Sequence, residues 1–239
     1  ATGTAASDSA VVSFIANAVA ADNVDGNVTI STNAPGQLPL GPTIVVFTAT
    51  DAAGNSSTGS ATITVADQTG PAVTVPAALV IAADDATGTA ATNSAIAAFL
   101  LAASAEDNVD DVLSPNNDAP DQFPLGATVV IFSATDAAGN LSTASSSITV
   151  ADQTVPVLSA PTAITVAAVD ALGTPATDSA VAAFLNAATV IDNVDSAVTI
   201  ENDAASTLAL GANLVTFSAV DSAGNIAVAV TSTITVADQ

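Results

Sequence analysis

The sequence contains no lysine, arginine or histidine, although 23 of its 239 residues are acidic. The formal net charge is therefore −23, and no cationic side chain offsets it. Nucleic acid is excluded as a partner because phosphate binding depends on lysine and arginine contacts. Attraction to an anionic membrane surface is excluded for the same reason. We expect strong self-repulsion that salt or bound divalent cations must reduce.

Cysteine, methionine, tryptophan and tyrosine are also absent. Without histidine, cysteine and lysine, the chain has no usual general base, thiolate or Schiff-base amine. Paired carboxylates could serve glycoside hydrolysis, but only seven phenylalanines are present to line a sugar cleft. We therefore predict a non-enzymatic protein.

The longest apolar run, residues 95–103, is too short to span a bilayer, so we expect no direct membrane insertion. No signal peptide is visible either. If the protein is exported, its targeting and anchoring segments lie outside these residues.

The chain repeats itself with a period of 85 residues. An Asp-Asn-Val-Asp motif recurs at 22–25, 107–110 and 192–195, and an Asp-Ala/Ser-Ala-Gly-Asn motif recurs at 51–55, 136–140 and 221–225. A unit of this length can bury its own core, unlike a solenoid turn. We therefore predict three domains, the first repeat at 1–68, the second at 69–153 and the third at 154–239.

The first repeat lacks about 16 residues that open the other two, which in the second repeat are 69–84. Two interpretations stay open. The start of the sequence is an arbitrary boundary in a longer array, or the missing first strand leaves a sheet edge that a neighbouring chain fills by strand donation.

Within each repeat, the residue pattern predicts strands around one helix. The opening segment alternates apolar and polar residues around Pro76 or Pro161, which is typical of an edge strand. Apolar residues then recur at i, i+3, i+4 and i+7 behind Asp8, Asn93 or Asp178, as in a capped helix. Strands and glycine-containing turns follow. We predict an all-β fold of tandem immunoglobulin-like β-sandwiches, each with one short helix inserted after the first strand.

Several stretches resemble the hyalin repeat (HYR) family. They are Pro-Leu-Gly at 39–41, Val-Val-Phe-Thr-Ala-Thr-Asp at 45–51, Ala-Ala-Gly-Asn at 52–55 and the closing Thr-Val-Ala-Asp at 64–67. The chain is also similar to bacterial immunoglobulin-like repeats of large surface proteins, and its lack of the cysteine pair of many hyalin repeats favours that version. The resemblance implies an immunoglobulin-like fold and a role in adhesion or extracellular architecture.

Aspartate outnumbers glutamate strongly among the acidic residues, which suits turns and also suits calcium, an ion that takes several oxygen ligands. The candidate ligands in the Asp-Asn-Val-Asp turns are Asp22, Asp25, Asp107, Asp110, Asp192 and Asp195. The candidates in the hairpins and linkers are Asp67, Asp136, Asn140, Asp152, Asp221 and Asn225. Turn and capping chemistry without any metal stays open at each position.

Strand length decides which of these residues can meet. Asp51 and Asp67 bracket a strand of about ten residues, or roughly 33 Å, so they cannot share an ion. The hairpin of a repeat must lie opposite its own exit linker. We therefore expect Asp67 to approach Asp136 and Asn140 of the second repeat, and the next linker to do the same one period later.

The leading functional hypothesis is a structural spacer, stalk or filament-forming module of an extracellular or cell-surface protein, with calcium as a candidate cofactor. Its partners would be neighbouring repeats or copies of itself. One alternative is a binding module for a cell-surface glycan or protein. Another is a self-assembling filament subunit completed by strand donation.

Overall fold

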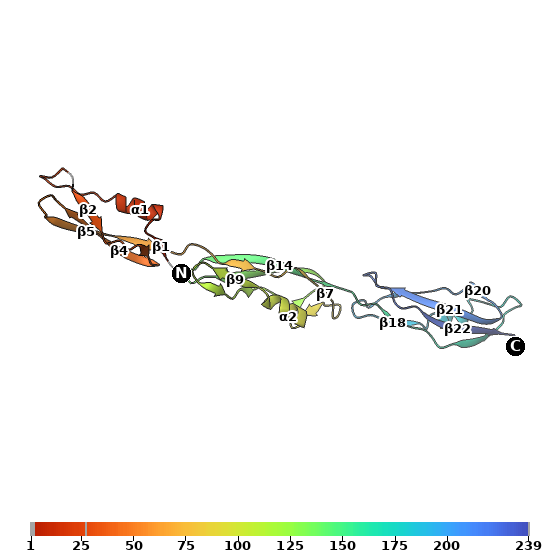
Figure 1. Ribbon diagram of the computed structural model, residues 1–239. Helices are drawn as coiled ribbons and strands as arrows, with labels where there is room; N and C mark the ends of the chain where they lie inside the picture. The colour runs from red at the N-terminus through yellow and green to blue at the C-terminus, as the bar shows by residue number, and fades with distance from the viewer. Residues whose placement is uncertain (1–2, 27, 239) are drawn as a thin grey trace. The chain divides into compact units, whose positions relative to one another are not determined.

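The computed structural model describes residues 3–26 and 28–238 (Figure 1). The chain forms two compact units, and their division runs through the second repeat, so it does not test the expected boundaries after residues 68 and 153. One unit comprises Ala1–Val75, Ala103–Asn117 and Ile131–Ala144, and the other comprises Pro76–Ala102, Asp118–Val130 and Ser145–Gln239. No described helix has the length and apolar character that a bilayer crossing needs.

The third repeat shows the complete fold. Its elements are β15 (Val157–Ser159), β16 (Ile164–Ala167), β17 (Thr174–Pro175), α3 (Ser179–Leu185), β18 (Thr189–Ile191), β19 (Thr199–Asn202), β20 (Thr207–Leu208), β21 (Gly211–Val220) and β22 (Val230–Ala237). A four-stranded sheet has the order β16-β22-β21-β19, and β15-β18 and β17-β20 form two-stranded sheets. β16 pairs with β22 in parallel, whereas β22 pairs with β21, its partner in Figure 1, in antiparallel fashion.

The second repeat has the same pairings one period earlier. Its elements are β6 (Ala72–Thr74), β7 (Leu79–Ala82), β8 (Thr89–Ala90), α2 (Ser94–Leu101), β9 (Ser104–Asp107), β10 (Asp111–Leu113), β11 (Asn116–Asn117), β12 (Gln122–Phe123), β13 (Gly126–Thr135) and β14 (Leu141–Ala151). β6 pairs with β9, β8 with β12, β11 with β13, and β7 pairs in parallel with β14.

The first repeat has the later elements without the opening pair. They are β1 (Thr4–Ala5), α1 (Ser9–Ala16), β2 (Thr29–Thr32), β3 (Gln37–Leu38), β4 (Gly41–Thr50) and β5 (Ser56–Val65). Its main sheet has three strands in the order β2-β4-β5, which run side by side in Figure 1. The position that β7 and β16 occupy in the other repeats, beside the last strand, has no strand in the described part of the first repeat.

Each helix begins where the sequence predicts. The side chains of Asp8, Asn93 and Asp178 accept hydrogen bonds from backbone amides two residues later, at 2.9, 3.0 and 2.9 Å. These N-caps satisfy amides that have no partner within the helix. The apolar stripe then faces the sheets, as Val181 and Phe184 of α3 do.

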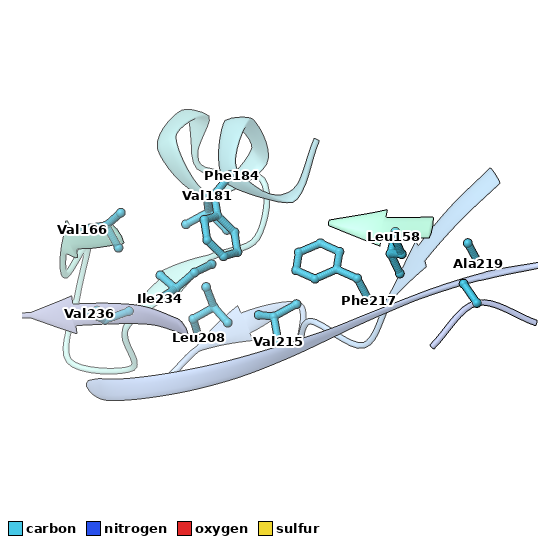
Figure 2. Packing of buried hydrophobic residues seen from close by; sticks show 11 residues of the cluster. Leu158, Val166, Val181, Phe184, Leu208, Val215, Phe217, Ala219, Ile234 and Val236 are labelled. Atoms are coloured by element: carbon cyan, nitrogen blue, oxygen red, sulfur yellow. The ribbon is translucent and has the colours of Figure 1, made fainter. Parts of the chain in front are cut away.

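The core of the third repeat lies between the sheets and α3 (Figure 2). The rings of Phe184 and Phe217 lie 6.1 Å apart at 52°. Leu158 of β15 and Val166 of β16 complete this core, at 7% and 8% exposure. Burial of such side chains contributes about 1.5–3 kcal/mol each. The opening segment is therefore an integral part of the core.

The opening segment differs from the single edge strand that the sequence suggests. In the third repeat it forms two short strands, β15 and β16, which pair with β18 and β22 in different sheets. Pro161 lies between them and has no amide hydrogen to give to a ladder, which suits the crossing point.

A glycine holds the start of β17 against β20. Gly173 has φ +120°, and a Cβ there would lie 1.9 Å from the carbonyl oxygen of Leu208. Gly88 and Gly3 make the same close approach in the other repeats. Only glycine fits here, since the close contact and the positive φ both exclude a side chain.

Candidate metal centre

Each hairpin motif forms a fixed Asp–Asn pair. In the second repeat, the backbone amide of Asn140 donates to Asp136 Oδ1 at 2.7 Å and its side-chain amide donates to Oδ2 at 2.7 Å. The pairs Asp51–Asn55 and Asp221–Asn225 repeat this geometry. The motif therefore orients one carboxylate at the end of the hairpin in every repeat.

The Asp-Asn-Val-Asp turn brings two more carboxylates to the hairpin. Asp107 Oδ2 accepts from the backbone amides of Val109 and Asp110, which closes the turn. Asp110 Oδ2 then accepts from the backbone amide of Ala137 at 2.7 Å, 27 positions later, and so ties the turn to the hairpin. Asp195 makes the same bond to Ser222 in the third repeat.

The linker aspartate contacts the hairpin through its backbone carbonyl oxygen. The side-chain amide of Asn140 donates to the carbonyl oxygen of Asp67 at 3.4 Å, and Asn225 donates to that of Asp152 at 3.4 Å. The amide that orients the hairpin carboxylate thus also holds the incoming linker.

The structure collects these residues into two clusters of four carboxylates. One oxygen from each member lies within 4.8 Å of those from the others. The first cluster is Asp67, Asp107, Asp110 and Asp136, and the second is Asp152, Asp192, Asp195 and Asp221. From the sequence, the turn positions and the linker positions were separate candidates. The structure merges them into one site per linker.

Some oxygens in these clusters are buried without a donor. Asp67 Oδ2 and Asp107 Oδ1 have no hydrogen-bond donor among the described residues, and Asp152 Oδ2 and Asp192 Oδ2 repeat the pattern. Burying a carboxylate oxygen without a partner is costly. Because the sequence contains no lysine, arginine or histidine, a cation that compensates these charges must come from solution.

The hairpin carboxylates are ionised. Burial raises the pKa of Asp136, but the hydrogen bonds from the side chain and backbone of Asn140 outweigh it, and the pKa lies below its ordinary value. The same balance lowers the pKa of Asp221. Both groups are therefore anionic at neutral pH and available as ligands.

The residues of each cluster are compatible with calcium. Calcium takes six to eight oxygen ligands at about 2.3–2.6 Å, so oxygens on opposite sides of one ion are about 4.8 Å apart. Carboxylate-only sites suit this hard cation, whereas zinc prefers nitrogen and sulfur ligands. Four carboxylates also match the multiple anionic ligands of calcium sites.

The first repeat supplies a natural comparison, because Asp22, Asp25 and Asp51 repeat the turn and hairpin positions. Asp25 Oδ2 accepts from the backbone amide of Ala52 at 3.0 Å, as in the other repeats. Among the described residues, these three aspartates do not belong to a carboxylate cluster like the other two. The backbone amides of Asp25 and Val24 hold the pKa of Asp22 below its ordinary value. In the structure these three residues make turn and hairpin hydrogen bonds, and a metal at Asp22 and Asp25 stays a prediction.

Sequence reasoning missed Asn193. Its side-chain amide donates to the carbonyl oxygens of Ala83 and Asp84, at 3.0 and 3.2 Å. These carbonyls follow β7, so the end of one opening segment contacts the residue next to Asp192 of the following repeat. The second position of the Asp-Asn-Val-Asp motif could have indicated this contact, because it is asparagine in all three copies.

Comparison with known proteins shows similarity to the HYR domain and to hyalins. The HYR domain family model matches residues 3–65. Hyalin from Lytechinus variegatus is 34% identical over 231 residues, which is 92% of this chain and 42% of that protein. The chain is hyalin repeat-like. This confirms the resemblance seen in the sequence, and with it the expected class of an extracellular, adhesion-type repeat protein.

A second hyalin, from Strongylocentrotus purpuratus, is 33% identical over 156 residues, which is 62% of this chain and 13% of that protein. The hyalin repeat-like chain thus spans less than half the length of either hyalin. These matches leave the bacterial version of the repeat, favoured by the missing cysteine pair, as a prediction.

Two of the solved structures that match the chain do so at low similarity. Protocadherin gammaB7 EC3-6 matches with a TM-score of 0.35 and 15% identity, over 89% of this chain and 67% of that one. A Ca²⁺-stabilized adhesin that helps an Antarctic bacterium bind ice matches with a TM-score of 0.26 and 19% identity, over 82% of this chain and 57% of that one.

Proposed function

We propose that this hyalin repeat-like chain is a non-catalytic spacer of an extracellular adhesive or structural protein, and that calcium stiffens the links between its repeats. The observation that carries the proposal is the recurrence of the same four-carboxylate cluster at both linkers, one period apart. A cluster that recurs at both linkers, and at no other place among the described residues, supports a role in the link.

The three predicted domains, 1–68, 69–153 and 154–239, are the modules of this spacer. Each cluster takes one carboxylate from the linker and three from the repeat that follows. Without a cation, the four like charges repel one another and favour a linker that moves away from the hairpin. A bound calcium ion would reverse this effect and hold Asp67 or Asp152 against the turn and the hairpin.

The charge of the chain supports the same function. A net charge of −23 keeps the protein soluble and opposes close packing with other acidic chains. Two calcium ions would offset part of this charge at the places where carboxylates crowd most. The partners we propose are neighbouring repeats and copies of the same protein.

Calcium titration by calorimetry, together with small-angle scattering, tests the proposal. We expect saturable binding of two calcium ions per chain and a larger, better-defined maximum dimension with calcium than with EDTA. Asp67→Asn keeps the side-chain oxygen that accepts from the Thr69 amide at 3.1 Å but removes the charge, and should leave one ion.

Asp25→Asn is the matched control, because it removes the same kind of charge in the repeat whose described aspartates form no such cluster. It should leave two ions per chain. Absence of saturable binding, or an equal loss in both variants, would show that the clusters are not the metal sites. Unchanged scattering despite binding would remove the stiffening role alone.

A further inference from the structure

The ends of β7 and β14 leave the second repeat side by side. These strands pair in parallel, with Ala82 opposite Ala151, and the backbone amide of Ala83 donates to the carbonyl oxygen of Ala151 at 2.9 Å. Asp152, the linker aspartate of the second cluster, follows directly. The loop after β7 and the linker to the third repeat therefore start next to each other, within one of the two compact units.

The loop after β7 is held by the fold of the second repeat. The backbone amide of Asp84 donates to the carbonyl oxygen of Gly88 at 3.1 Å and to the hydroxyl of Thr89 at 3.2 Å. Thr89 is fully buried, and its hydroxyl donates to the carbonyl oxygen of Ala82 at 3.2 Å. The carbonyl oxygens of Ala83 and Asp84 are thus acceptors in a fixed position.

Asn193 of the third repeat binds both acceptors. Its side-chain nitrogen donates to the carbonyl oxygen of Ala83 at 3.0 Å and to that of Asp84 at 3.2 Å. The opposite orientation of the amide would place its oxygen against two carbonyl oxygens, so the contact fixes the side chain. Because Asn193 Oδ1 is buried, bulk water competes little for this amide, which strengthens the two bonds.

The third repeat also holds the linker at a separate point. The side-chain amide of Asn225 donates to the carbonyl oxygen of Asp152 at 3.4 Å. Asn193 belongs to the Asp-Asn-Val-Asp turn and Asn225 to the hairpin, and the backbone amide of Ser222 joins the two by donating to Asp195 Oδ2 at 2.8 Å. One connected part of the third repeat therefore contacts two neighbouring segments of the second.

Two contacts restrain a link in a way that one cannot. A contact with the linker alone leaves the third repeat free to turn about the linker, whereas a second contact with a different segment opposes that rotation. We propose that Asn193 is a positioning residue that fixes this rotation without a cation. Asp192 and Asp195 then already lie beside Asp152 when calcium binds. The effect on calcium affinity rests on the proposed function, but the effect on rotation does not.

The chemistry of the Asn193 contact suits this role. The four carboxylates of the second cluster repel one another when no cation is bound. The bonds from Asn193 join neutral groups, so they need no cation and salt screens them little. They therefore oppose the repulsion in the state in which the cluster is empty.

The distance between two spin labels across the link tests the proposal. The chain has no cysteine, so Ser145→Cys and Thr231→Cys, at exposed positions of β14 and β22, can each carry one nitroxide. In EDTA we expect a narrow distribution of distances. Asn193→Leu should make it at least about twofold wider, because leucine has a similar shape but donates no hydrogen bond.

Calcium should reverse the effect of the substitution. Saturating calcium should narrow the distribution again in the Asn193→Leu chain, a rescue that a merely structural role of Asn193 would not give. Calorimetry should show about two- to tenfold weaker binding at the second cluster, because apparent affinity falls with the fraction of chains in which the site is assembled. The first cluster serves as the internal reference.

Asn202→Leu is the matched control in the same repeat. Asn202 is exposed, and its side chain accepts a local hydrogen bond from the backbone amide of Ala204 at 3.3 Å. This variant should leave the distance distribution and calcium binding unchanged. Hydrogen exchange along β14 and β21 should be the same in both variants, which would show that both repeats stay folded.

Three outcomes in EDTA would overturn the proposal. They are a distribution that Asn193→Leu does not widen, equal widening by Asn202→Leu, and a distribution that is already wide in the unaltered chain and narrows only with calcium. A chain that binds no calcium but still widens with Asn193→Leu would refute the proposed calcium function and support the role of Asn193 in rotation.

Discussion

The side-chain amide of Asn140 lies 3.4 Å from the carbonyl oxygen of Asp67, a residue 73 positions earlier in the chain. The same amide donates to Asp136 at 2.7 Å. One asparagine thus couples the linker that leaves the first repeat to the hairpin of the second. The contact brings the linker aspartate to the other carboxylates, and it recurs at Asn225.

Replacing Asn140 with alanine should weaken calcium binding at the first cluster by about tenfold or more, a typical effect of removing a residue that orients metal ligands. Calorimetry of the Asn140→Ala chain checks this, with the second cluster as an internal reference. Asn55→Ala is the control, since it loses the same hairpin bonds in a repeat without the linker contact. Equal loss of calcium affinity in both variants would contradict the role of Asn140.

Removing calcium should lower the thermal stability of the chain. Calcium at 100 times its dissociation constant adds about 2.7 kcal/mol per site if only the folded state binds it, which raises Tm by roughly 5 °C or more. Calorimetric melting in calcium and in EDTA, at constant ionic strength, measures the shift. A magnesium series at the same ionic strength separates specific binding from charge screening. Identical melting curves in all three solutions would refute a metal-dependent fold.

Acid should destabilise the chain below about pH 3.8. Hydrogen bonds from Asn55 and from backbone amides near it hold the pKa of Asp51 below the ordinary 3.8, and Asp22, Asp136 and Asp221 also have lowered values. A carboxylate with a lowered folded-state pKa stabilises the fold above its unfolded pKa. That contribution is lost as the pH falls through the folded value. Chemical unfolding from pH 6 to pH 2 in EDTA should show a decline confined to the acid end, and rising stability below pH 3.8 would contradict it.

Gly173→Ala should cost much more stability than Gly211→Ala. Both glycines have a positive φ, at +120° and +97°, which costs a non-glycine residue about 1–2 kcal/mol. A Cβ at Gly211 meets nothing within 4 Å, whereas one at Gly173 would lie 1.9 Å from the carbonyl oxygen of Leu208. Hydrogen exchange in the third repeat checks the difference. Equal effects would mean that β17 can move away from β20 at little cost.

Local features of the fold were predictable from the sequence. The helix caps at Asp8, Asn93 and Asp178 depend on residues a few positions apart, and so do the turns with Gly54, Gly139 and Gly224, all at positive φ. The meeting of the linker with the next hairpin followed from strand length alone. Such features need no knowledge of long-range pairing.

The composition of the site was less predictable. Nothing near Asp110 in the sequence shows that its carboxylate accepts a hydrogen bond from the backbone amide of Ala137. This bond holds the Asp-Asn-Val-Asp turn next to the hairpin aspartate. The split of the opening segment between two sheets could not be predicted either, because it depends on long-range strand pairing. Short apolar runs such as 157–159 and 164–167 do not reveal which strand they pair with, or in which direction.

The parallel pairing of β16 with β22 has a mechanical consequence. Within the third repeat the chain passes from β15 into β16 and leaves the repeat after β22, so tension that reaches these two strands pulls them in opposite directions along their length. Their four paired positions are then loaded together in shear, instead of opening one after another.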